Sequence, residues 1–226
     1  MRVILIGASG LLGNSFVYVA PEFGVNIKKI SRGNQDGSSL YCDLSVLDSV
    51  ASSLLQIDNI NSGDVVLINS GVLGPVGLGA EVELSELINA VNINALSNIP
   101  IFKALQIQGV RKYVIVSSGA ANKLYSGWFA YCLSKALQKS IWSALAHDYP
   151  EISVRLIAPG VLPSDMHNFT NVIERGRYPE LEKFYQIKKN GDYQNPELSA
   201  RKIIQLLIQD EFFSTGFEFI DLRSLG

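Results

Sequence analysis

The chain has few of the residues from which metal centres and disulfide frameworks are built. Among its 226 residues are two cysteines and two histidines. Cys42 and Cys132 lack metal-ligand spacing, and they are typical of reduced, buried thiols in a cytosolic protein. His147 and His167 belong to no Ser-His-Asp arrangement and to no ligand cluster, so we predict no metal site. His147 suits a helix end, and a substrate contact by His167 stays open.

Strong charge imbalance and long apolar runs are also missing. The net charge is −2 and no basic stripe is present, so we do not expect nucleic acid as a partner. No apolar run reaches about 18 residues, so no transmembrane helix and no membrane partner are expected. Glycines interrupt the apolar N-terminus, which therefore indicates strand, turn and helix rather than a secretory signal. We predict a cytoplasmic protein.

What the chain does have is enough apolar sequence for a sizeable core. It is 47% hydrophobic and 18% charged, which suits a single α/β domain over residues 1–226. Short β-branched runs alternate with helical patterns. Strands are predicted at 3–6, 25–30, 40–42, 65–69, 113–117, 152–157 and 217–220, and helices at 11–19, 47–57, 81–105, 129–147 and 196–208. This order predicts a doubly wound parallel sheet (Rossmann fold) of about seven strands with helices on both faces.

Two interruptions stand out in this alternation. Pro100 lies inside the helix predicted at 81–105 and should bend it. The stretch 162–195 contains no strand pattern, and a connection of this length is typical of a lid over a binding site. The aromatic side chains near the site or in this segment suit core packing or the wall of an apolar substrate pocket. They are Trp128, Phe129, Phe169, Tyr178, Phe184 and Tyr185.

A glycine-rich turn lies between the first predicted strand and the first helix. Glycines allow a tight turn and a close approach of a pyrophosphate to the backbone, and the helix N-terminus offers free N–H groups. A tight turn that binds nothing is the alternative. The predicted cofactor-binding residues of this turn are Gly7, Ser9, Gly10, Leu11, Leu12 and Gly13.

The end of the second predicted strand should select the cofactor. An acidic residue about 20 positions after the turn would bind a ribose 2′-hydroxyl and favour NAD. Here Ser31-Arg32 follows the strand, and a guanidinium suits a 2′-phosphate. We therefore favour NADP(H), while Asp36 nearby leaves NAD(H) possible.

Tyr131 and Lys135 form a pair with catalytic potential. Four residues make about one helical turn, so the phenol and the ammonium lie on one face of a helix. A free phenol has a pKa of about 10, and a nearby positive charge lowers it. We expect the pKa of Tyr131 to be drawn toward neutrality, where a phenol can act as an acid–base group.

At this point the sequence resembles the short-chain dehydrogenase/reductase family over nearly its whole length. The motifs occur in the family's order and spacing, which is more specific than any one of them. In chain order they are Asp43-Leu44, Asn69-Ser70-Gly71, Val91-Asn92, Val116-Ser117-Ser118-Gly119, the Tyr131 and Lys135 pair, and Pro159-Gly160-Val161-Leu162-Pro163-Ser164.

The resemblance implies an activity and a role for each motif. Tyr131, Lys135, Ser118 and Asn92 correspond to the catalytic tetrad, with Asn94 as a competitor for the place of Asn92. Asp43-Leu44 would contact adenine, and the turn after the fourth strand and the segment from Pro159, Gly160 and Leu162 to Ser164 would complete the cofactor site. The implied reaction is NADPH-dependent reduction of a small-molecule carbonyl, or oxidation of the matching alcohol. The family also implies a homodimer or homotetramer.

Two departures from the family pattern leave alternatives open. Gly10 comes one residue early, which is similar to the epimerase and dehydratase branch, although this chain has no room for that branch's substrate domain. Ser70 replaces a common alanine. A non-catalytic NADP-binding regulatory protein is the other alternative, and an intact tetrad argues against it. The substrate stays open: residues 73–80, the lid and the C-terminal tail should set it, and Arg175 and Arg177 could meet an acidic group.

Overall fold

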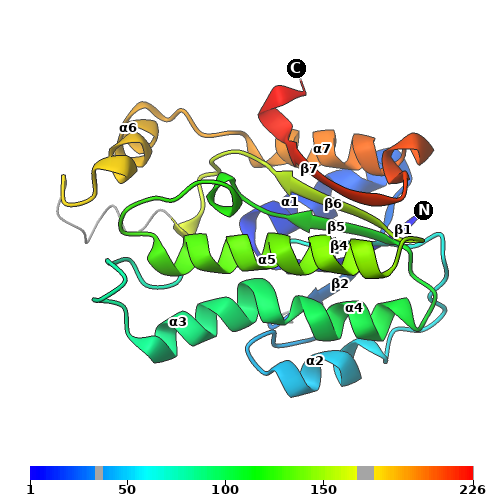
Figure 1. Cartoon of the computed structure of the whole chain (residues 1–226). Helices are drawn as coiled ribbons and strands as arrows, with labels where there is room; N and C mark the ends of the chain where they lie inside the picture. The colour runs from blue at the N-terminus through cyan, green and yellow to red at the C-terminus, as the bar shows by residue number, and fades with distance from the viewer. Residues whose placement is uncertain (34–37, 167–175, 226) are drawn as a thin grey trace.

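A seven-stranded, all-parallel sheet forms the centre of the molecule (Figure 1). The computed structural model describes residues 1–33, 38–166 and 176–225. The strand order is β3-β2-β1-β4-β5-β6-β7, which confirms the predicted doubly wound sheet. The strands are β1 (Arg2–Ile6), β2 (Asn26–Ser31), β3 (Leu40–Tyr41), β4 (Val65–Ile68), β5 (Lys112–Val116), β6 (Ser153–Ala158) and β7 (Gly216–Asp221).

Helices cover both faces of this sheet. Helices α1 (Leu11–Val19) and α7 (Pro196–Leu207) pack on one face, and α2 (Leu47–Leu54), α4 (Asn98–Gln106) and α5 (Phe129–Asp148) pack on the other (Figure 1). Successive strand residues point to opposite faces, so Val3 and Leu5 join one apolar core while Ile4 and Ile6 join the other. Near-continuous apolar strands are what a sheet buried on both faces requires.

The helix predicted at 81–105 is divided into three parts. The α-helix α3 spans Leu84–Val91, a π-helical turn spans Asn92–Leu96, and α4 follows at Asn98. The prediction of one continuous helix was therefore wrong. Pro100 lies in the first turn of α4, where it has no N–H to offer the preceding turn, so the change of helix type comes just before the proline.

The segment 162–195, predicted as a lid without a strand, contains a helix that was not predicted. In its described part, a 3₁₀ turn at Pro179–Leu181 leads into α6 (Glu182–Asn190), which ends at Gly191 with φ +73°. Glu182 lies in the first turn and Lys188 and Lys189 in the last, which suits the helix dipole. His167, Phe169 and Arg175 lie outside the described residues.

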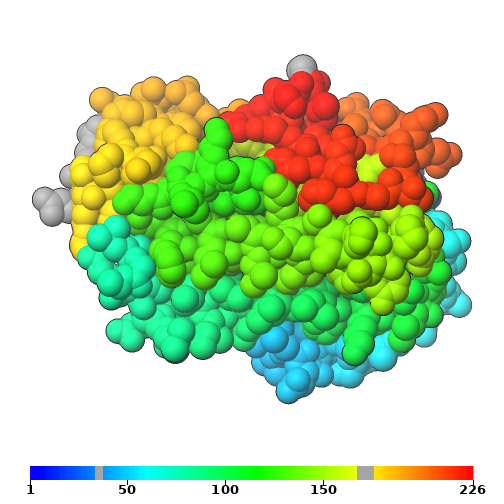
Figure 2. Space-filling model, viewed as in Figure 1, coloured from blue at the N-terminus to red at the C-terminus, as the bar shows by residue number. Residues whose placement is uncertain are grey.

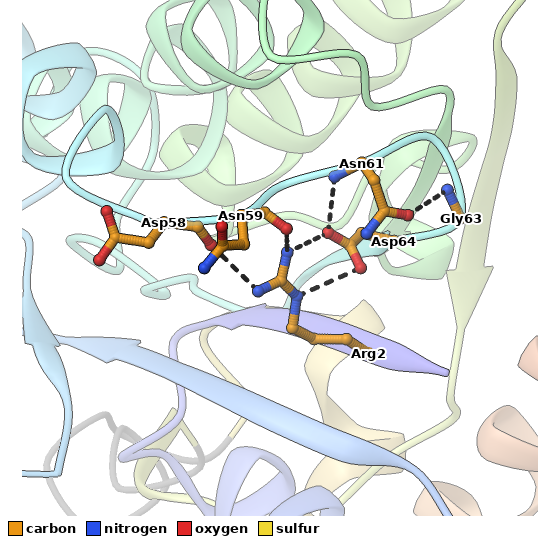
Figure 3. Close-up of polar contacts among 6 residues, drawn as sticks. All are labelled: Arg2, Asp58, Asn59, Asn61, Gly63 and Asp64. Carbon is orange, nitrogen blue, oxygen red and sulfur yellow. Dashed lines mark hydrogen bonds and ion pairs between the residues drawn. The ribbon is translucent and has the colours of Figure 1, made fainter.

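A charged network fastens the first strand to the loop before β4 (Figure 3). Arg2 forms an ion pair with Asp64, and its guanidinium also donates to the backbone carbonyls of Asp58 (3.1 Å) and Asn59 (2.5 Å). Asp64 additionally accepts from the backbone N–H of Asn61 at 3.1 Å. These contacts fix the two central strands, β1 and β4, at the sheet end opposite the carboxyl ends.

The strand order reverses between β1 and β4. The chain runs outward through β2 and β3 and then returns to β4 on the other side of β1. The loops after β1 and β4 consequently meet at the carboxyl ends of adjacent strands, which is where open α/β sheets bind ligands.

Candidate active site

The glycine turn after β1 is shaped by two close backbone contacts. Gly7 has φ +89° and its N–H donates to the Ile30 carbonyl at 2.9 Å. A Cβ on Gly13 would lie 2.3 Å from the Gly7 oxygen, so a larger residue would push α1 away from the turn. Asn69 closes the turn from β4, because its Nδ2 donates to the Gly7 oxygen at 2.9 Å. The tight turn predicted at 7–13 is confirmed.

A cleft opens beside this turn at the reversal of strand order. Its wall combines residues predicted from the sequence with apolar ones that the motifs did not identify. The former are Gly7, Ser9, Gly10, Ser31, Arg32, Asp43, Leu44, Asn69, Ser70 and Gly71, and the latter are Ile6, Ile30, Cys42, Val72 and Ile93. Leu12 is instead 5% exposed in the core behind the turn, and neither it nor Leu11 nor Gly13 lines the cleft.

The two ends of the cleft differ in their chemistry. One end has a helix N-terminus without an acidic residue in its first turn. The other end has Arg32, which is exposed and close enough to Asp43 to contribute to a lowered pKa of that carboxyl. The main cause of that lowering is the backbone N–H of Ser45, which donates to Asp43 at 2.9 Å. Asp36 lies outside the described residues.

Lys135, one member of the predicted catalytic pair, lies beside the cleft. Its side chain is 3% exposed, and its Nζ donates to the Val116 carbonyl at 3.2 Å. A Cβ on Gly71 would lie 3.5 Å from this Nζ and 3.4 Å from Asn94 Oδ1, so the loop after β4 passes close to the ammonium. Tyr131 lies one turn earlier on α5, with its ring centroid 6.0 Å from Nζ. The predicted pairing of these two side chains on one helix face is confirmed.

The electrostatics of Tyr131 differ from the prediction. Burial raises the pKa of Tyr131 to about 12, and a hydrogen bond with Ser118 lowers it only in part. Burial also lowers the pKa of Lys135 to about 8. The expected lowering of the phenol pKa was therefore wrong for the ligand-free site, because desolvation of the phenolate outweighs the ammonium 6.0 Å away.

Ser118 follows β5 and faces the same helix. Its Oγ accepts from the backbone N–H of Ala120 at 3.2 Å and caps a 3₁₀ turn at Gly119–Ala121. This contact gives Ser118 a structural role alongside its hydrogen bond with Tyr131. The motif thus brings a hydroxyl donor and a phenol together at the end of β5, as the sequence predicted.

The π-helical turn makes the two asparagines unequal. Asn92 is half-buried, whereas Asn94 is 0% exposed. Asn94 clamps the loop after β4, because its Oδ1 accepts from Val72 N at 2.8 Å and its Nδ2 donates to Val72 O at 2.7 Å. Its Nδ2 also donates to Ser134 Oγ at 2.9 Å. Asn94 thus joins the Gly71 loop to α5, and the tetrad role of Asn92 stays a prediction.

The lid segment packs on the catalytic helix through aromatic rings. Trp128 contacts Tyr131 edge-on at 5.5 Å and stacks on Phe184 of α6 at 4.4 Å. Tyr125 contacts both Trp128 and Phe184. Figure 2 shows the segment after residue 176 lying against the surface formed around residues 120–130. These rings pack against one another next to Tyr131, and Trp128, Tyr178 and Phe184 are buried, as the core-packing alternative for the aromatic residues predicted.

A polar clasp holds the same segment to the loop before α3. Arg177 pairs with Glu81 at 2.8 Å, and Tyr178 donates its hydroxyl to Glu81 at 3.3 Å. Gly127 has φ +85°, and a Cβ there would lie 2.6 Å from the Tyr178 ring. The predicted lid is therefore fixed on two sides, and Arg177 is already engaged by a carboxylate.

The segment after β6 returns toward this region. Gly160 has φ +89°, and a Cβ added at this position would lie 2.8 Å from Gln194 Cγ. Leu162 packs against the core beneath α7, and Ser164 is half-buried with its N–H donating to the Leu162 carbonyl at 2.8 Å. Pro159 is buried at the end of β6. The cofactor contacts predicted for this segment stay predictions.

Comparison with known proteins decides the family. The family model for short chain dehydrogenases matches residues 4–173, which cover the glycine turn, the cleft and helix α5. The chain belongs to the short-chain dehydrogenase family. As a member it is an oxidoreductase, and its reductase relatives support a carbonyl reductase type of activity.

Similar members of the short-chain dehydrogenase family include two curated reductases. Benzil reductase ((S)-benzoin forming) of Bacillus subtilis is 26% identical over 223 residues, which cover 90% of this chain and 92% of the relative. Sepiapterin reductase of Mus musculus is 30% identical over 159 residues, covering 66% and 60%. A short-chain dehydrogenase/reductase from Burkholderia multivorans, solved with bound NADP, superimposes with a TM-score of 0.76 at 17% identity over 98% and 96% of the chains.

Two further features concern the cysteines and the apolar character of the helices. Both cysteines are free and buried, as predicted. Within residues 1–33, 38–166 and 176–225, no helix combines the length and apolar character needed to cross a membrane.

Proposed function

We propose that this chain reduces the carbonyl group of a bulky, largely apolar small molecule with NADPH. The observation that carries the proposal is the convergence of Tyr131, Ser118 and Lys135, with Lys135 beside Gly71 of the cleft wall. An acid, an oxyanion donor and a fixed cation then lie at one end of a dinucleotide-shaped cleft.

The cofactor preference is supported by Arg32. Its exposed guanidinium lies in the cleft wall just after β2, where a 2′-phosphate would be bound. The residues at this position are Ser31 and Arg32, and neither is the acidic residue that favours NAD. The NADP-bound neighbour is in line with this preference. NAD(H) stays the alternative.

Each catalytic side chain has a distinct task in this proposal. When bound, a reduced nicotinamide supplies the hydride that the carbonyl carbon receives. Tyr131 gives its phenolic proton to the oxygen as negative charge develops there, and Ser118 donates a hydrogen bond to the same oxygen. Lys135 holds a positive charge beside the phenolate left on Tyr131. We propose Asn94, rather than Asn92, as the asparagine that positions the Gly71 loop against Lys135.

The ionisation of Tyr131 favours the reductive direction. A phenol with a pKa of about 12 is protonated at neutral pH, and an acid catalyst must begin in that state. An alkoxide is a stronger base than phenolate, so proton transfer from Tyr131 is downhill. Oxidation would instead require deprotonated Tyr131 and should accelerate as the pH rises.

The substrate proposal follows from the cluster of aromatic rings. Tyr125, Trp128 and Phe184 form a packed aromatic cluster beside Tyr131, and we propose that an aromatic or polycyclic carbonyl compound binds along it. The relatives named for benzil and sepiapterin reduction agree with a ring-bearing substrate. Since Arg177 is paired with Glu81, we do not assign it to an acidic substrate group.

Cofactor titration followed by a substrate panel tests the proposal. Fluorescence titration should show tighter binding of NADPH than of NADH. Turnover should then appear with aromatic ketones and diketones and fall at least about 10²-fold in Tyr131→Phe while NADPH affinity is kept. Binding without turnover of any carbonyl would favour a regulatory protein. A cofactor that stays tightly bound and cycles without net oxidation would favour the epimerase alternative.

We also propose that the chain forms a homodimer or homotetramer through α3 and α5, two helices in contact with each other. Large apolar side chains are exposed on them: Leu84, Ile88, Phe129 and Leu133. Such a face is costly to leave in water. Light scattering should give a multiple of the 24.7 kDa chain mass, and Ile88→Glu together with Leu133→Glu should reduce it.

A further inference from the structure

We propose that Gln138 is a positioning residue that holds the ammonium group of Lys135 beside the cleft and keeps it protonated. The inference rests on the proposed function, in which Lys135 works as a fixed cation. Gln138 lies on α5 three residues after Lys135, so the two side chains share a helix face. Its side chain is 0% exposed, and its Oε1 accepts from Lys135 Nζ at 3.2 Å.

Two acceptors fix the direction of the lysine side chain. An ammonium group has three N–H donors. Gln138 Oε1 and the Val116 carbonyl each accept one of them at 3.2 Å, from the helix and from the sheet respectively. One donor is left for a ligand, and Gly71 of the cleft wall lies beside the ammonium, because a Cβ added to it would be 3.5 Å from Nζ. Without Gln138, a single backbone carbonyl would hold the flexible side chain.

An amide side chain at position 138 costs folding free energy. Its Nε2 is buried and has no hydrogen-bond partner among the described residues. A buried donor left unsatisfied costs free energy, whereas an aliphatic side chain of similar volume would pack there without that cost. The orientation of the amide follows from the chemistry, because an ammonium group offers only donors and must face the oxygen. The contact with Lys135 is the interaction that offsets the unsatisfied donor.

Among the described residues, no neighbouring charge replaces Gln138 in stabilising the ammonium, and Lys139, the next residue on α5, donates to Asn122 Oδ1. The π-helical turn, the 3₁₀ turn after β5 and residues 116–118 contain no ionisable side chain, and Tyr131 on α5 is a neutral phenol. On β6 and β7 the charged side chains are already paired, Arg155 with Glu218 and Asp221 with Arg223. Glu86 on α3 and Lys103 on α4 are exposed. Burial, which lowers the pKa of Lys135 to about 8, is the only cause of its shift.

Two substitutions at Gln138 should move the ionisation of Lys135 in opposite directions. Gln138→Leu removes an acceptor from the charged form, so the pKa of Lys135 should fall by about one unit. Gln138→Glu places a carboxylate against the ammonium and should raise it by about one unit or more. The measurement is an NMR pH titration of the lysine side-chain signals without cofactor, with Lys135→Met used to assign the signal.

Binding and turnover provide a second readout. The pH at which NADPH affinity declines, and the alkaline limb of kcat/KM, should shift down in Gln138→Leu and up in Gln138→Glu. The NMR and binding measurements do not need a substrate, so a chain that reduces no carbonyl still tests Gln138 independently of the proposed function. Tyr113→Phe is the matched control, because it removes a buried hydrogen bond to Val110 without touching Lys135.

Identical Lys135 titrations in the parent chain and both variants would overturn the proposal, as would a loss of thermal stability in Gln138→Leu without any shift of the pH profile. If Gln138→Leu fails to fold, Gln138→Glu and Gln138→Asn decide. Asparagine withdraws the amide by one methylene and should lower the pKa as leucine does. A Gln138→Asn titration equal to that of the parent chain would contradict the proposal.

Discussion

Trp128 and Phe184 stack with their ring centroids 4.4 Å apart, and this contact joins the start of the catalytic helix to the helix of the lid. Trp128 also meets Tyr131 edge-on at 5.5 Å. One indole therefore touches both the proposed acid and the segment that covers it. Changes in the lid should accordingly be felt first as changes in substrate binding.

Phe184→Ala should weaken substrate binding more than chemistry. The ring is 5% exposed, and its removal opens the aromatic cluster beside Trp128. We expect the KM for an aromatic ketone to rise about tenfold, equivalent to about 1.4 kcal/mol, with a smaller change in kcat. Steady-state kinetics measure both. Phe212→Ala, which packs at the opposite sheet face, is the control and should leave KM unchanged. An equal rise in both variants would refute a local role for Phe184.

The clasp between Glu81 and Arg177 should open in acid. The pKa of Glu81 is lowered, first by the backbone N–H of Leu78 and then by Arg177. A group whose pKa is lower in the folded state stabilises the fold above its ordinary pKa, and this contribution is lost as the pH falls through the lowered value. Cleavage of the 176–195 segment by an acid-active protease should therefore increase at low pH.

Glu81→Gln should produce the same protease sensitivity at neutral pH, because the uncharged amide no longer pairs with Arg177. Glu86→Gln removes an exposed carboxylate from α3 and serves as the control. Equal protection of the segment in all three chains would show that the aromatic contacts hold it without the clasp.

Arg32→Ala should change cofactor choice. If the guanidinium binds a 2′-phosphate, its loss should weaken NADPH binding at least about tenfold, since hydrogen bonds to charged groups contribute about 1.5–3 kcal/mol. NADH affinity should stay the same, and fluorescence titration with both cofactors measures the difference. Lys28→Ala on β2, the strand that precedes Arg32, removes an equal charge and is the control. Parallel losses for NADPH and NADH would disprove the assignment.

Asp64→Ala should destabilise the fold without altering the site. It leaves the guanidinium of Arg2 without its carboxylate in a part-buried setting, and we expect about 2 kcal/mol of lost unfolding free energy. Denaturant unfolding measures the loss. Asp58→Asn is the matched control, because Arg2 contacts the backbone carbonyl of Asp58 and not its side chain. A loss of similar size in Asp58→Asn would point to loop sequence rather than to the ion pair.

The parts of this fold that depend on local sequence could be predicted. Seven short apolar runs gave the seven strands, and the glycine spacing gave the turn and the α1 bounds, because period and chain flexibility act over a few residues. Helix α6 was not predicted, because its sequence is strongly polar and Phe184 is its one buried residue. The π-helical turn at Asn92–Leu96 was not predicted either, because the sequence pattern is helical on both sides of it and within it.

The juxtaposition of Tyr131, Lys135 and Ser118 could be predicted from the sequence, whereas the direction of the pKa shift of Tyr131 could not. The four-residue spacing places Tyr131 and Lys135 on one face, yet it carries no information on burial. Desolvation depends on residues far apart in the chain, such as Phe184 and Trp128, and it reverses the expected direction of the pKa of Tyr131. The role of Gln138 likewise follows from β5 lying against α5, which supplies the Val116 carbonyl.

The π-helical turn at Asn92–Leu96 contains one residue more than an ordinary turn would need. Deleting one residue there would join α3 and α4 into one helix that is still bent at Pro100. Each residue of an α-helix rotates the chain by about 100°, so everything on one side of the deletion would swing by that amount relative to the other. Asn94 would then leave Val72 and Ser134, and the loop that lies beside Lys135 would lose its anchor. The extra residue of the π-helical turn thus determines the direction of the Asn94 side chain, which joins the Gly71 loop to α5.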